Sequence, residues 1–165
     1  MSSGSIQYLG LERLPGEGTL LVPGLLEHRH LAGLQKKFSG RRITWLVEEN
    51  ALVEPEVRDY LGHDGVAAAT ISIDDPSPAE VGEALQAKLE DGGLLIYIPG
   101  DIVARPGSPC HIPASHLRFL CELGLPTTPL AVHVPADTCL SIENKSKLPA
   151  AIISVGHPIA AEQAS

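Results

Sequence analysis

Short runs of β-branched and other apolar residues alternate along this chain with segments of helical pattern, and this alternation limits the fold more than any other feature. It predicts an α/β fold, in which a largely parallel or mixed central sheet is flanked by helices. The predicted strands are Ile6–Leu9, Thr19–Val22, Ile43–Val47, Val66–Ile73, Leu94–Ile98, Leu130–Val134 and Ala151–Val155. The predicted helices are Glu27–Phe38, Pro55–Leu61, Pro78–Leu89 and Ala114–Leu123.

The helix predicted over Pro78–Leu89 has the most complete set of local signals. Ser77 is suited to cap its amino end, and Pro78 suits the first helical position. Val81, Leu85 and Leu89 recur on one face and predict the buried side of the helix.

Length and composition predict one globular domain. The chain has 165 residues, of which 44% are hydrophobic and 19% charged, enough for a buried core and too apolar for a disordered chain. We expect this domain to span residues 6–160, with residues 1–5 as a cloning scar and 161–165 as a tail. The 12 basic and 20 acidic residues give a formal charge of -8, which disfavours nucleic acid as a partner.

Cysteine usage predicts a reducing compartment. Cys110, Cys121 and Cys139 are odd in number and have no CxxC spacing, so we expect a cytoplasmic protein without a disulfide framework. No apolar run approaches the roughly 20 residues that span a bilayer. Cys110, His111 and His116 lack the further partners of a structural zinc site, so no metal is expected.

A polar turn follows the apolar run Leu94–Ile98 and is the first place to expect a binding site. Residues 99–108 carry one carboxylate, Asp101, and one guanidinium, Arg105, within a stretch rich in proline and glycine. In open α/β folds, loops beyond the carboxyl ends of the strands form the ligand crevice. Trp45 lies inside a predicted strand, and we expect it to face the core or a helix.

Three sequence blocks together resemble the glycerolipid acyltransferase family, which acylates lysophosphatidic acid and related lysophospholipids. The phrase G-L-E-R-L-P at 10–15 precedes T-L-L-V-P at 19–23, where the family has a strand leading into N-H-x-S-x-x-D. The family's F-P-E-G-T-x-S-R-x-G falls in register on 98–107, and I-I-S-V-G-H-P-I at 152–159 is similar to its closing strand. The resemblance runs from Tyr8 to Ile159 and implies an acyltransferase-like fold.

The chain departs from this family where the family places its catalytic groups. The family's histidine is a general base on the acceptor hydroxyl and is oriented by an aspartate, but Leu25 and His30 stand at these positions. Gly100 replaces the family's glutamate, and Asp101 stands beside it. Arg105 matches a charged position of the pattern and is a candidate to bind phosphate.

Two functions follow from the resemblance. The first is a domain of phospholipid metabolism that has lost catalysis and binds a lipid, an acyl carrier or a fused neighbouring domain. The second is an active divergent acyltransferase, with His28, His30 and Asp101 as a displaced catalytic set and Arg105 and Gly100 at the acceptor. Its acyl donor would be acyl-coenzyme A or acyl-carrier protein, and no other cofactor is implied.

Each candidate residue also has a purely structural interpretation. His28 and His30 would then form a solvated helix start, Asp101 would bond its own turn, and Arg105 would be a solvated loop charge. The resemblance further implies a place at the cytoplasmic membrane face, as part of a larger protein.

Overall fold

The computed structural model describes residues 6–23, 28–100, 114–133 and 151–159 and has the α/β fold that the sequence predicts. Seven strands form one sheet in the order β1-β7-β6-β2-β5-β3-β4. The strands are β1 (Ile6–Leu9), β2 (Thr19–Pro23), β3 (Ile43–Glu48), β4 (Ala67–Ile71), β5 (Leu94–Ile98), β6 (Thr127–His133) and β7 (Ala151–Val155). The helices are α1 (His28–Lys37), α2 (Pro55–Leu61), α3 (Pro78–Leu85) and α4 (Ala114–Glu122), with 3₁₀ turns η1 (Leu11–Arg13), η2 (Glu49–Val53) and η3 (Gln86–Gly92).

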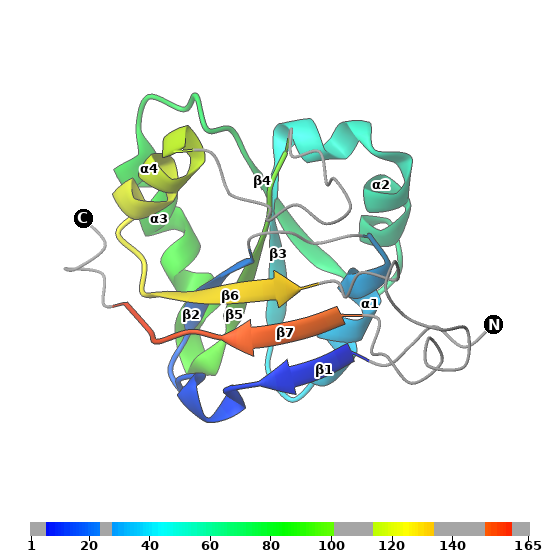
Figure 1. Ribbon diagram of the computed structural model, residues 1–165. Helices are drawn as coiled ribbons and strands as arrows, with labels where there is room; N and C mark the ends of the chain where they lie inside the picture. Colours follow the sequence, from blue (N-terminus) through cyan, green and yellow to red (C-terminus); the bar gives the residue numbers. More distant parts are fainter. Residues whose placement is uncertain (1–5, 24–27, 101–113, 134–150, 160–165) are drawn as a thin grey trace.

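The five strands from β6 to β4 run parallel to one another, and β7 runs antiparallel to β6. β1 pairs parallel with β7, so both of these strands oppose the other five. Helices α1 and α2 cover one face of the sheet, and α3 and α4 cover the other (Figure 1). The mixed, mostly parallel sheet between two helical layers confirms the predicted fold class.

The core consists of two apolar layers, one under each pair of helices. Trp45, Ile96 and Leu34 belong to the layer under α1 and α2, whereas Leu95 and Phe119 belong to the layer under α3 and α4. All residues of β2, β3 and β5 are buried, as expected for central parallel strands covered on both faces. Trp45 is fully buried and donates from Nε1 to Gln35 Oε1 of α1 at 2.8 Å, which confirms its predicted place.

Among the strands, β6 and β4 differ most from their predicted bounds, and the structure shows why. β6 begins at Thr127 rather than Leu130 because Thr127 already pairs with Leu20 of β2. Pro129 lies within β6 before its pairing with β7 starts at Leu130, so the proline does not end the strand. β4 spans only Ala67–Ile71 because the following residues turn, with Asp75 N donating to Ser72 O at 3.1 Å.

The helix predicted over Pro78–Leu89 divides in two. The α-helical part ends at Leu85, and the chain continues as the 3₁₀ turn η3, in which Asp91 has φ 55°. Pro78 occupies the first turn as predicted, and Leu85 and Leu89 are buried. Ser77 occupies the predicted N-cap position, but its side chain makes no capping hydrogen bond.

Candidate functional site

The carboxyl ends of β2, β5 and β3 meet at one edge of the sheet and mark the candidate site. These neighbouring strands are in register, with Leu21 opposite Ile96 and Ile98 opposite Val47. The helix after β2 lies on one face of the sheet and the helix after β5 lies on the other (Figure 1). Such a divergence is a topological switch point, where open α/β sheets bind ligands.

A buried carboxylate lies at this edge, contributed by the last residue of β3. Glu48 is fully buried, and its Oε2 accepts a hydrogen bond from Asn50 N at 2.9 Å, while Oε1 accepts from Asn50 Nδ2 at 3.4 Å. The carboxylate thereby forms the cap of η2. A buried charge is tolerated only when such donors replace its hydration.

Gly100 lies directly against this carboxylate. A Cβ built on Gly100 would overlap Glu48 Oε2 and would lie 2.8 Å from Asn50 Cβ and 3.0 Å from Ala51 N. The space that a side chain at position 100 would need is therefore filled by residues of β3 and η2. Glycine is required here by close approach, because no larger residue fits without moving Glu48.

A tyrosine and a histidine pair on the face of the sheet covered by α3 and α4. The Tyr97 hydroxyl lies 3.1 Å from Nδ1 of His116, in the first turn of α4, and both residues are buried. Burial raises the pKa of Tyr97 well above its usual value, and the negative charge of Glu48 raises it further. The phenol therefore stays protonated at neutral pH beside the imidazole of His116.

The structure buries one of the predicted site histidines. His30 is only 1% exposed, although its structural interpretation predicted a solvated helix start. That expectation is wrong for His30, because it lies on the same stripe of α1 as the buried Leu31 and Leu34 and the helix packs this stripe on the sheet. His28 is the first residue of α1, and its side chain lies outside the described part.

Three further predicted positions, Leu25, Asp101 and Arg105, lie outside the described residues. Of the predicted set, the structure therefore places His30 and Gly100 near the carboxyl edge, on α1 and after β5. Sequence reasoning missed Glu48, Asn50 and Tyr97. An available signal was the acidic pair Glu48-Glu49 directly after the apolar strand Ile43–Val47, the same pattern of a polar turn after a strand that drew attention to Asp101.

The residues that the structure describes contain no group of three or more histidine, cysteine or acidic side chains arranged to hold a metal ion. His116, considered with Cys110 and His111 at the sequence level, has Nδ1 beside the Tyr97 hydroxyl. Cys110 and His111 lie outside the described residues. None of the described helices is both long and apolar enough to cross a membrane.

No protein-family model, curated protein or solved structure matches this chain. The carboxyl edge itself offers a switch point, a buried carboxylate that caps η2 and a buried tyrosine–histidine pair.

Proposed function

We propose that this chain is an acyltransferase-like domain of phospholipid metabolism that has lost catalysis and acts as a binding module for a lipid, an acyl carrier or a neighbouring domain. The observation that carries the proposal is the close packing of Gly100 on Glu48. The resembled family has a glutamate at this position, and here the space for its side chain is taken by another carboxylate. The difference from the family therefore involves the packing of β3 against the end of β5 as well as the residue at position 100.

The positions of the two sequence blocks support the resemblance. The block that would contain the family's base follows β2, and the block that would contain its acceptor-binding residues follows β5. Because β2 and β5 are neighbouring parallel strands, both blocks leave the sheet at the same edge. A two-block site needs such a juxtaposition, and the sequence order alone does not guarantee it.

The chemistry at the base position supports loss of catalysis. Leu25 has no proton acceptor, so it does not deprotonate an alcohol. The orienting carboxylate of the family is replaced by the buried imidazole of His30, which does not supply the negative charge that stabilises an imidazolium. Binding at the edge needs neither group, and Arg105 remains the candidate for the phosphate.

The test measures transfer and binding on the same unmodified chain. Labelled acyl groups are offered from acyl-coenzyme A and acyl-carrier protein to a panel of lysophospholipids, and binding of each component is followed by calorimetry. We expect no turnover and saturable binding of at least one lysophospholipid or acyl donor. For a phosphate-bearing ligand, Arg105→Gln should weaken binding about tenfold. The exposed Arg58→Gln on α2 serves as the control.

Turnover would overturn the proposal if it fell roughly 100-fold or more in His28→Ala, His30→Ala or Asp101→Ala, because that loss is typical of a removed general base. It would establish an active divergent acyltransferase. The proposal would equally fail if the chain neither turned over nor bound any lysophospholipid or acyl donor.

A variant that restores the family's residues needs a fourth change. Leu25→His with His30→Asp and Gly100→Glu would force the new glutamate onto Glu48. Adding Glu48→Gly removes the overlap with Glu48, and a small shift of η2 must relieve the remaining contact of 2.8 Å with Asn50 Cβ. Acyl transfer gained by the folded fourfold variant would support a retained binding edge whose chemistry has been lost.

A further inference from the structure

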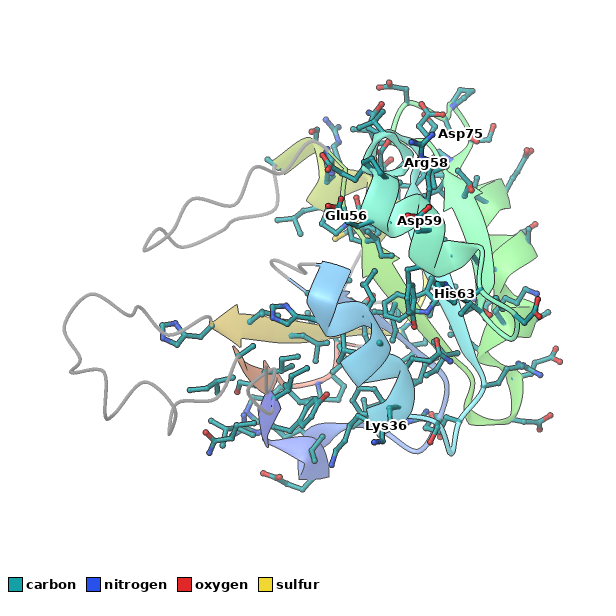
Figure 2. The ribbon with its side chains drawn as sticks, turned by 90° about the vertical axis from the view of Figure 1, so that its right-hand side faces the viewer. Lys36, Glu56, Arg58, Asp59, His63 and Asp75 are labelled. Atoms are coloured by element: carbon teal, nitrogen blue, oxygen red, sulfur yellow. The ribbon has the colours of Figure 1, made fainter. Side chains whose placement is uncertain are left out.

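A groove separate from the carboxyl edge lies between α1 and α2. It has a volume of about 630 Å³ and is open to solvent. Its lining includes three basic side chains, Lys36, Arg41 and His63, and the ring of Tyr60. Figure 2 shows Lys36 near the carboxyl end of α1 and His63 just beyond α2, with Glu56 and Arg58 nearer the amino end of α2. Lys36 lies six residues beyond His30, roughly 9 Å along the helix axis.

Among the residues that the structure describes, no carboxylate forms an ion pair with the basic side chains of this groove. Arg41 donates to four backbone carbonyls, from Nε to Gly92 at 2.6 Å, from one terminal nitrogen to Pro15 at 2.8 Å, and from the other to Gly16 at 3.4 Å and Glu17 at 2.8 Å. Within the described ranges, the ion pair present joins Arg118 to Glu122 on α4, which covers the opposite face of the sheet from the groove. The groove therefore carries local positive charge in a chain of net charge -8.

One wall of the groove, the Tyr60 ring, is held by partly buried contacts with Trp45 and Gln35. The Tyr60 ring meets the fully buried Trp45 edge to face, with the centroids 5.8 Å apart. Gln35 Oε1 accepts from Trp45 Nε1 at 2.8 Å and from the Tyr60 hydroxyl at 3.4 Å. Because these contacts hold the ring in place, a ligand that packs on it pays little to order it.

His63 is held in a similar way at the end of α2. Its Nδ1 lies 2.8 Å from Asp59 O and 3.2 Å from Tyr60 O. Both partners are carbonyl oxygens, so Nδ1 carries a proton and donates. The carboxyl-bearing side chains of α2 are not part of the lining, which leaves the basic groups facing the groove.

We propose that the groove binds a small organic anion, namely a phosphate monoester or carboxylate that also carries a flat apolar portion. The Lys36 ammonium and the Ser39 hydroxyl supply donors for the anionic group, and the Arg41 guanidinium adds its field. The Tyr60 ring and the Ala32 methyl group supply the apolar surface. This combination of one charge cluster and an apolar wall is typical of small-molecule sites.

The experiment titrates the full chain, labelled with ¹⁵N, with phenyl phosphate and follows backbone amide shifts. We expect saturable shifts in residues 32–41 and 60–63, with smaller shifts elsewhere. Lys36→Gln should weaken binding about five- to tenfold, since it removes one charge-assisted contact. The matched control is Lys37→Gln, because the Lys37 ammonium lies over the Tyr8 ring, 5.1 Å from its centroid, and outside the groove.

Two further probes separate the contributions of charge and ring. Inorganic phosphate should bind more weakly than phenyl phosphate, and benzyl alcohol should not produce these shifts. Raising the salt concentration from 50 to 500 mM should weaken phenyl phosphate binding severalfold, as screening requires. The proposal fails if phenyl phosphate causes no saturable shift in the groove, if Lys37→Gln weakens binding as much as Lys36→Gln, or if benzyl alcohol binds equally well. Equal binding of inorganic and phenyl phosphate would overturn the role of the apolar wall.

Discussion

At the scale of single residues, Gly100 shows that the reason for a residue type can lie in a distant part of the chain, here in Glu48. The sequence marks position 100 as a departure from a family pattern and supplies no reason for glycine. The structure supplies the reason, because a buried carboxylate from another strand occupies the space of a Cβ. His30 is a similar case, since its burial depends on which stripe of α1 packs on the sheet.

We predict that Gly100→Ala destabilises the domain by about 1–3 kcal/mol, the usual range for overpacking a close contact. Gly40→Ala is the matched control, because nothing lies within 4 Å of the Cβ it would add, and its effect should stay within about 0.5 kcal/mol. Urea denaturation of both variants measures the difference. Equal stabilities of the two variants would contradict the packing described for Glu48.

At the scale of elements, the sequence predicted which segments form strands and helices more reliably than where they end. β1, β5, β7 and α2 have the predicted bounds. β6 starts earlier than predicted, and α3 ends earlier than predicted, at Leu85. β6 is extended by pairing with β2, and Gly82 of α3 packs closely on Leu123, just beyond α4.

We predict opposite outcomes for alanine at two helical glycines. At Gly82, the new Cβ would overlap the backbone oxygen of Leu123, so Gly82→Ala should cost about 1–3 kcal/mol despite the better helix propensity of alanine. At Gly33 of α1, the nearest atom is the flexible Ile6 Cδ1 at 2.6 Å, so Gly33→Ala should be nearly neutral or slightly stabilising. Thermal unfolding of the two variants checks this, and a stabilised Gly82→Ala would show that α3 and α4 are not closely packed there.

At the scale of the whole molecule, the two apolar layers keep three tyrosines from ionising easily. Burial raises the pKa of Tyr8, Tyr60 and Tyr97. Tyr97 is fully buried between the sheet and α4, and the charge of Glu48 adds to the effect of burial. A group with a raised folded-state pKa binds its proton more tightly in the folded chain, which links the stability of the domain to pH.

We predict that the contribution of the protonated, buried tyrosines to the unfolding free energy is fully present below pH about 10, where the unfolded tyrosines are also protonated. It is lost as pH rises above that value. Tyr97 alone should account for up to about 1.4 kcal/mol per pH unit in this range. The fall in unfolding free energy between pH 9.5 and 11 should therefore be shallower in Tyr97→Phe than in the unmodified chain. Tyr8→Phe, at a half-buried position, is the comparison and should change the slope less.

Tyr97→Phe should also lose about 1–2 kcal/mol at neutral pH, because His116 Nδ1 would lose the hydroxyl beside it. Unchanged alkaline slopes in both variants would contradict the link between tyrosine burial and stability.

The sequence by itself determined the α/β class, the seven strands of the described sheet, the buried face of α3 and the strand ends at which polar turns occur. These follow from periodicity and turn chemistry, which act over a few residues. Only the tertiary structure decided the strand order, the meeting of the β2 and β5 ends, the contact of Glu48 with Gly100 and the pairing of Tyr97 with His116. These join residues from different elements, so they depend on which surfaces pack together, and no local pattern in the chain encodes that choice.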